Sequence, residues 1–229
     1  ADKEKKDAEE KPVTTQHQLK LPGRILKYSV TTGLMPLKNE QGEKEADIFF
    51  MAYTAERAGG PAKRPLMFSF NGGPGSSSVW LHLGALGPKR VVVPDDGTMP
   101  APPYAVADNP LTWLTHFDLV FIDPPHTGWS IAVSDDARKR LFSVDGDVAA
   151  LTEVMRGWLT RHKRWGSKVY LAGESYGTTR GAALADSLLS AFVALEGVIL
   201  VSCAMDLQSL VFEPRNDLPY ATFLPGLAN

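Results

Sequence analysis

The segment LAGESYGTTR, residues 171–180, places Ser175 between two glycines in the pattern Gly-x-Ser-x-Gly. This spacing is typical of a serine nucleophile on a sharp turn between a strand and a helix, where the hydroxyl stands above the edge of a sheet. Such a serine needs a neighbouring base to take its proton, usually a histidine oriented by a carboxylate. The sequence therefore predicts Ser175 as the nucleophile of an acyl-transfer reaction.

A glycine-rich stretch, FNGGPGSSS at residues 70–78, follows an apolar segment that is typical of a buried strand. In the α/β-hydrolase plan, one amide of the oxyanion hole comes from the loop after the third strand, and the other comes from the residue after the nucleophile. A phosphate-binding loop and a purely structural turn are the alternatives. The stretch lacks the Lys-Ser/Thr ending of a P-loop and the pattern Gly-x-Gly-x-x-Gly, which counts against a phosphate site.

The elements around these motifs alternate between strand and helix. Residues 23–33 and 45–56 have the composition of paired strands, and residues 144–162 and the segment after Ser175 have the period of helices. Uniformly apolar runs that favour buried strands occupy residues 64–70, 117–123, 167–173 and 196–202. This order predicts an α/β fold with a mostly parallel sheet and helices on both of its faces.

The chain is predicted to form one domain after a short leader. Residues 1–22 are rich in alternating charges and are interpreted as a disordered leader, whereas residues 23–229 carry the strand and helix patterns. The initial alanine is compatible with cleavage of a signal peptide, which favours a periplasmic or secreted protein. The proline- and glycine-rich residues 94–110 are interpreted as a surface excursion.

The composition argues for a peptide or small-molecule partner. The chain has 229 residues, 24 basic and 26 acidic side chains and a formal charge of -2, a balance that indicates neither nucleic acid nor an anionic membrane as partner. No apolar run reaches the roughly 18 residues of a membrane span. The one cysteine, Cys203, leaves no intrachain disulfide and no cysteine-based metal site, and we expect a buried, inert thiol. No metal and no organic cofactor are expected.

Four motifs in this order, NGGPGSSS, DNPLTW, FIDPPHTGWS and GESYG, resemble those of the serine carboxypeptidases, peptidase family S10, and especially of their bacterial members. The resemblance runs from about residue 44 to the end of the chain. It implies that Ser175 is the nucleophile and that the backbone amides of Gly73 and Tyr176 bind the oxyanion. It also implies that Asn71 and Glu174 hold the free C-terminal carboxylate of a peptide; the alternative for Glu174 is a structural hydrogen bond.

Two positions depart from the family pattern. The family commonly pairs the glutamate with a second one just before a Gly-Pro, but Ala85 stands there in this chain, so the acidic pH optimum of the family is not implied. Ser76 stands where the family often has a cysteine that forms a disulfide, which fits the bacterial branch.

The remaining triad members are the open question. Asp186, Asp206 and Asp217 follow Ser175, but no histidine does. The fold places the Asp and the His of the triad after the nucleophile, so this chain resembles the first half of a serine carboxypeptidase, without the last strands and the cap. His126 is the one upstream candidate for a substitute base, whereas His17, His82, His116 and His162 are interpreted as ordinary leader, helix and loop residues.

Three functional hypotheses follow. In the first, the chain is the N-terminal portion of a serine carboxypeptidase, inactive alone, and a missing segment or a second polypeptide supplies the Asp, the His and the cover for the exposed edge of the sheet. In the second, a noncatalytic relative binds peptide C-termini. In the third, the chain belongs to an esterase or acyltransferase of the same fold.

Overall fold

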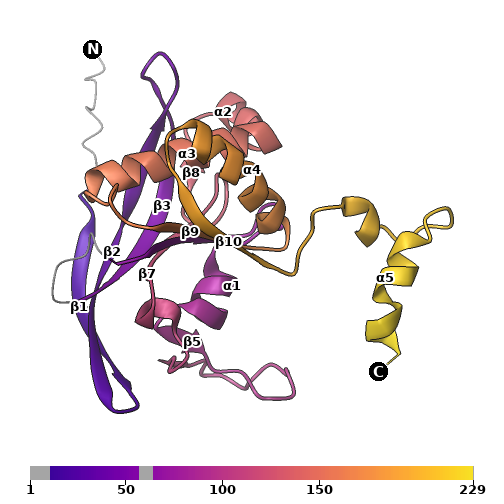
Figure 1. Ribbon diagram of the computed structural model, residues 1–229, viewed down its shortest axis with the longest axis horizontal. Coiled ribbons are helices and arrows are strands. Elements are labelled where there is room, and N and C mark those ends of the chain that lie inside the picture. Colours follow the sequence, from indigo (N-terminus) through magenta and orange to yellow (C-terminus); the bar gives the residue numbers. More distant parts are fainter. Residues whose placement is uncertain (1–10, 57–63, 229) are drawn as a thin grey trace.

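A mixed β-sheet forms the centre of the computed structural model, which describes residues 11–56 and 64–228 (Figure 1). The strand order is β1-β2-β3-β7-β4-β9-β10, with β8 paired to β3. Strands β1, β2, β3 and β7 pair antiparallel in that order, and β7, β4, β9 and β10 are parallel. The strands of this sheet are β1 (Val13–Leu21), β2 (Arg24–Lys38), β3 (Lys44–Ala55), β4 (Leu66–Phe70), β7 (Asp118–Ile122), β8 (Ile131–Ala132), β9 (Val169–Glu174) and β10 (Leu195–Val201).

Helices cover both faces of this sheet, and two further helical segments, η4 and α5, follow β10. Their bounds are α1 (Val79–Leu81), the π-helical turn η2 (His82–Leu86), the 3-10 turn η3 (Trp113–Thr115), α2 (Asp135–Leu141), α3 (Val144–Arg161), α4 (Tyr176–Ser190), the 3-10 turn η4 (Leu207–Leu210) and α5 (Leu218–Leu227). The predicted α/β architecture is therefore confirmed, as are the helix predicted over residues 144–162 and the helix after Ser175.

Alternating side chains of the parallel strands make two hydrophobic cores. Val120 and Ile122 of β7 face α3 and α4 and share a core with Trp158, which is 2% exposed. Leu119 and Phe121 of the same strand face the other side, toward α1, η2 and η3. Because both faces of β4, β7 and β9 are covered, most side chains of these strands are apolar, as the sequence indicated.

The N-terminal segment differs from the prediction. Residues 13–21, which were expected in a disordered leader, form β1 and pair with β2 from Val13 opposite Thr32 to Leu21 opposite Arg24. Leu19 is fully buried beneath this pairing. The strand is stabilised by its antiparallel partner, which contributes hydrogen bonds that the segment's own composition does not reveal. Residues 1–10 of the predicted leader lie outside the described residues.

The 94–110 excursion also contains structure of its own. Strand β6 (Val106–Asp108) lies within it and pairs antiparallel with β5 (Lys89–Val91), which precedes the excursion, so the two strands form a ribbon beside the main sheet (Figure 1). The exposed Lys89 and Asp108 form a salt bridge across this ribbon. Most of the other residues of the excursion are exposed, as predicted, but Asn109 is buried, and its Nδ2 donates to the carbonyls of Ala85 and Gly87.

Strand β10 is an edge strand rather than a buried one. Only β9 pairs with it among the described residues, and Leu200 and Val201 are 42% and 38% exposed. Cys203 follows this edge and is exposed, so the prediction of a buried thiol was wrong. An apolar run such as residues 196–202 predicts a buried strand. Because β10 lies at the edge of the sheet, part of this run remains in contact with solvent.

The segment after β10 extends away from the sheet. Figure 1 shows η4 and α5, in yellow, on an arm to the side of the sheet. The arm is held together by its own aromatic contacts, in which the ring of Phe212 lies 5.2 Å from that of Tyr220 and 5.4 Å from that of Phe223. No described helix is long and apolar enough to span a bilayer.

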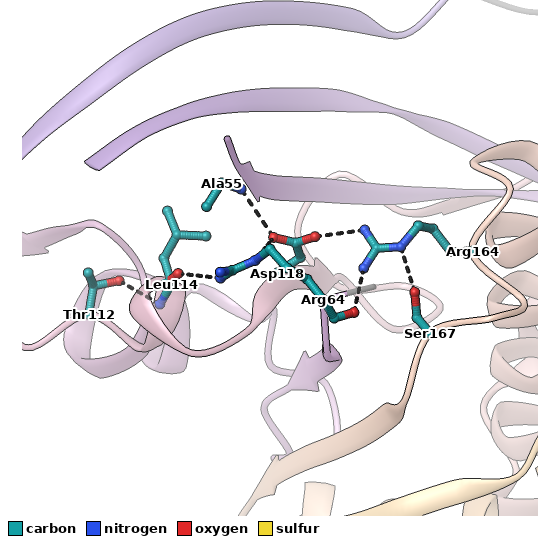
Figure 2. Close-up of polar contacts among 7 residues, drawn as sticks. All are labelled: Ala55, Arg64, Thr112, Leu114, Asp118, Arg164 and Ser167. Carbon is teal, nitrogen blue, oxygen red and sulfur yellow. Dashed lines mark hydrogen bonds and ion pairs between the residues drawn. The ribbon is translucent and has the colours of Figure 1, made fainter. Parts of the chain in front are cut away.

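Three charged side chains are buried where the parallel strands begin (Figure 2). Asp118, the first residue of β7, is 1% exposed and binds Arg64 Nε through one oxygen and Arg164 Nη1 through the other, each over 2.8 Å. The amide of Ala55 also donates to Asp118, and Arg64 Nη2 donates to the carbonyl of Leu114. This Asp118 cluster joins β3, β4, β7 and the turn before β9 at the edge of the sheet opposite Ser175.

Candidate active site

Ser175 lies on a tight turn between β9 and α4. Its backbone has φ 57° and ψ −126°, a conformation that non-glycine residues avoid and that costs on the order of 1–3 kcal/mol. A Cβ on Gly173 would stand 2.0 Å from the carbonyl oxygen of Gly177, so the turn requires glycine at that position. The amide of Ser175 donates to the carbonyl of Val201 over 3.0 Å. Strand β10 thus supports the sharp turn at Ser175 that the sequence predicted.

The glycine-rich loop after β4 lies directly against this turn. A Cβ on Gly72 would stand 2.4 Å from the amide nitrogen of Tyr176, a distance that no side chain tolerates. Gly73, the next residue, and Tyr176 were predicted to bind an oxyanion through their amides. The two loops that carry these residues are therefore packed together at the carboxyl ends of β4 and β9.

Asn71 and Glu174 are in direct contact, although they lie 103 residues apart in the chain. Asn71 is fully buried, and its Oδ1 accepts a hydrogen bond from the amide of Leu81 over 3.0 Å. Because that oxygen accepts, Nδ2 is the end that faces Glu174, to which it donates over 3.0 Å. The amide of Asn71 is thus locked in one orientation, and the partly exposed carboxylate of Glu174 is brought beside it.

The positions that depart from the family pattern lie near this loop. The hydroxyl of Ser76 accepts a hydrogen bond from the indole of Trp80 over 3.1 Å. Ala85 is exposed on η2, and its carbonyl accepts from Asn109 Nδ2 over 2.8 Å.

No described side chain hydrogen-bonds the hydroxyl of Ser175. His126, in the loop after β7, has φ 62°, and its Nε2 is buried without a partner among the described residues. Burial lowers the pKa of His126, and the charge of Arg138 lowers it further. Asp206 is occupied as the cap of η4, where it accepts from the amide of Gln208. The structure therefore brings together Ser175, the glycine loop and the Asn71–Glu174 pair, but within residues 11–56 and 64–228 no acid–base side chain hydrogen-bonds the hydroxyl of Ser175.

The other histidines have ordinary structural contacts. His82 Nε2 lies 2.6 Å from the hydroxyl of Tyr53, and its ring stacks on Phe121. His162 stacks on Trp158 at the end of α3. His17 belongs to β1 rather than to a leader, and its Nε2 lies 2.7 Å from the hydroxyl of Thr15.

Acid is expected to destabilise the fold through His82. Burial lowers its pKa from 6.5 to about 4, so the unfolded chain binds a proton at a pH where the folded chain does not. The contribution of His82 to the free energy of unfolding is fully present above pH 6.5. It is lost as the pH falls toward 4, which lowers the free energy of unfolding by about 2–3 kcal/mol. Denaturant titrations at pH 7 and 4.5 should show a smaller loss for His82→Gln, while His116→Gln, on the exposed His116, serves as control. An equal loss in the His82 variant and the wild type would contradict the assignment.

Sequence reasoning missed one buried ion pair beside the site. Arg180 of α4 donates through Nε to Asp147 of α3 over 2.6 Å, and both side chains are nearly buried. The pair borders a small pocket of about 20 Å³ that Pro74, Gly75 and Tyr176 also line. The only signal in the sequence was a charged residue on an otherwise apolar helix face, which by itself does not identify a partner.

A serine on a strand-to-helix turn beside a glycine-rich loop, at the carboxyl edge of a sheet covered by helices, is the arrangement of the α/β-hydrolases, and the chain has this fold. The family model for serine carboxypeptidases, Peptidase S10, matches residues 22–210. The chain belongs to this family.

Relatives of the family agree with this assignment. The pheromone-processing carboxypeptidase KEX1 of Saccharomyces cerevisiae is 32% identical over 155 residues, which cover 63% of this chain and 20% of that protein. Serine carboxypeptidase-like 13 of Arabidopsis thaliana is 26% identical over 82% of this chain and 44% of its own length. The crystal structure of the yeast KEX1 prohormone-processing carboxypeptidase superposes with a TM-score of 0.64 at 23% identity, over 85% of this chain and 45% of that one. The chain thus spans less than half the length of these relatives.

Proposed function

We propose that this chain is the N-terminal portion of a serine-type carboxypeptidase that removes C-terminal residues from peptides. The observation that carries the proposal is the contact between Asn71 and Glu174 directly beside Ser175. An amide donor and a carboxyl group that share one hydrogen bond form a site for a second carboxylate when one of the two carboxyl groups is protonated. Such a site next to a nucleophile selects the end of a peptide chain.

The proposed reaction is acyl transfer. Ser175 Oγ attacks the carbonyl carbon of the last peptide bond while a base takes its proton, and the amides of Gly73 and Tyr176 stabilise the oxyanion that forms. The C–N bond then breaks, and the C-terminal residue leaves with the proton on its amine. Water hydrolyses the remaining ester and regenerates the hydroxyl of Ser175.

The triad Asp and His are proposed to come from a further segment or a second polypeptide. The edge of β10 has no partner among the described residues beyond β9, and it runs next to the turn that holds Ser175. The arm after β10 exposes apolar side chains, among them Leu207, Phe212 and Leu224 at 57%, 50% and 61% exposure. A segment that adds a strand to β10 and covers the arm would reach the site. Export to the periplasm or the medium remains part of this proposal.

The test is a fluorophosphonate probe followed by intact-mass spectrometry under denaturing conditions, together with a peptidase assay on the same sample. An adduct on Ser175, with release of single residues from the C-terminus of a peptide, is the expected result for the assembled enzyme. Peptide binding without an adduct would favour a noncatalytic relative. Labelling with ester hydrolysis that does not require a free C-terminal carboxylate would favour an esterase or acyltransferase of the same fold.

Removal of the Glu174 carboxylate should weaken the selection of chain ends. Hydrogen bonds to charged groups contribute about 1.5–3 kcal/mol, so Glu174→Ala should raise KM roughly 10- to 100-fold for peptides with a free C-terminus. The matched substrate is the same peptide with an amidated C-terminus, whose KM should change little. Equal changes for both substrates would indicate that Glu174 is only a structural partner of Asn71.

A further inference from the structure

A buried arginine lies behind the two loops of the candidate site. The side chain of Arg180 is 3% exposed and projects from the helix that begins after Ser175. Its Nε donates to Asp147 Oδ2 over 2.6 Å, and its Nη1 donates to the main-chain carbonyl of Asn71 over 2.6 Å. The guanidinium carbon also lies 5.1 Å from the centre of the Tyr176 ring. One side chain thus contacts both segments that carry the predicted oxyanion amides.

The carbonyl that Arg180 binds belongs to the start of the glycine loop. It belongs to the peptide group between Asn71 and Gly72, and Gly72 is the residue whose backbone lies against the amide of Tyr176. A charged hydrogen bond to that carbonyl holds the loop from one side, while the contact with the Tyr176 ring holds the first turn of α4 from the other. Arg180 therefore bridges the two segments whose separation sets the spacing of the amides.

Asp147 orients this guanidinium. Its side chain is 9% exposed near the start of α3, and burial raises its pKa while the charge of Arg180 opposes the rise. The planar guanidinium of arginine can contact a carboxylate, a carbonyl and an aromatic ring at the same time. A lysine ammonium is a point charge and cannot reproduce the three contacts together.

The Asp118 cluster provides an internal comparison. Arg164 in that cluster also binds a carboxylate and a main-chain carbonyl, those of Asp118 and Arg64, in a fully buried setting. It precedes β9, whereas Ser175 follows the same strand, so the two sites lie about 20 Å apart at the rise of a β-strand. An arginine of matched chemistry is therefore available far from the candidate site.

We propose that Arg180, oriented by Asp147, is a positioning residue of the candidate active site: it holds the Asn71–Gly72 peptide against the first turn of α4 and thereby sets the spacing between the amides of Gly73 and Tyr176. The inference rests on the proposed acyl-transfer function. An oxyanion develops only as the reaction proceeds, so a change in this spacing should lower kcat more than it raises KM.

The kinetic test compares Arg180→Lys with Arg164→Lys in the full-length enzyme. We expect Arg180→Lys to lower kcat on the order of 10- to 100-fold and to change KM less than about threefold. Arg164→Lys should lower the melting temperature by a similar amount but leave kcat unchanged. Asp147→Asn keeps a hydrogen-bond acceptor for Arg180 and serves as a second variant if Arg180→Lys does not fold. Equal losses of kcat in the variants at the two sites would overturn the proposal.

A structural readout separates this inference from the proposed function. The amide signals of Gly72, Gly73 and Tyr176 in ¹⁵N-correlated NMR spectra should move in Arg180→Lys and stay in place in Arg164→Lys. Signals that do not move in Arg180→Lys would overturn the positioning role whether or not the protein is an enzyme. A wild-type protein that neither cleaves peptides nor reacts with the fluorophosphonate, but whose amides respond to Arg180→Lys, would refute the proposed function and support the bridge between the two segments.

Discussion

Ser175→Ala is expected to abolish fluorophosphonate labelling and to lower kcat for peptide hydrolysis at least about 10⁴-fold in the assembled enzyme, because no acyl-enzyme can form without the hydroxyl. Peptide binding should stay within about twofold of the wild type, since binding is assigned to Asn71 and Glu174 rather than to the nucleophile. Kinetics on a peptide with a free C-terminus and calorimetric binding of the same peptide measure the two effects separately.

The matched control is Ser190→Ala, a serine that is exposed at the end of the same helix. It should leave both labelling and turnover unchanged. Loss of binding with preserved turnover in Ser175→Ala would overturn the assignment of roles. The strained backbone at Ser175 adds a second expectation, because alanine relieves none of that strain and stability should therefore change little.

Asp118→Ala should lower the free energy of unfolding by about 3–5 kcal/mol, the usual cost of removing one partner from a buried ion pair. The substitution leaves the guanidinium groups of Arg64 and Arg164 without the carboxylate that holds both of them (Figure 2). It also leaves the amide of Ala55 without its acceptor. Urea titrations of the wild type and the variant measure the difference.

Replacement of the whole cluster provides the control for this prediction. A triple variant with Arg64→Met, Asp118→Leu and Arg164→Met removes every charge at once, and buried ion clusters exchanged for apolar side chains of similar volume are often neutral in stability. We expect the triple variant to be more stable than Asp118→Ala. The opposite order would mean that the neutral hydrogen bonds of the cluster, rather than its charges, dominate its contribution.

The local signals of the sequence predicted the elements around the nucleophile correctly. The predicted strand over residues 64–70 corresponds to β4, and the helix predicted over 144–162 corresponds to α3. Glycines at positions 173 and 177 identified the elbow, because a turn with so close an approach of backbone to backbone excludes side chains. These features depend on residues that are neighbours in the chain, which is why the sequence alone reveals them.

Contacts between residues far apart in the sequence could not be predicted from local sequence patterns. The strand β1 was predicted as disordered leader because its partner, β2, contributes the hydrogen bonds that order it. The exposure of Cys203 was missed because an apolar run has the same composition at the edge of a sheet as in its centre. In each case the error came from strand pairing, which was present for β1 and, among the described residues, missing at the edge of β10, and which the local sequence does not reveal.

The sequence by itself determined the sharp turn at Ser175, the glycine loop, the strands and helices around them and the family motifs, because each is a short-range pattern with its own steric requirement. Only the tertiary structure decided that Asn71 Nδ2 faces Glu174 and that Arg180 holds the carbonyl of Asn71. These contacts join residues that the chain keeps 103 and 109 positions apart. They form because parallel strands bring their carboxyl ends to one edge of the sheet, where side chains from β4, β9 and α4 meet.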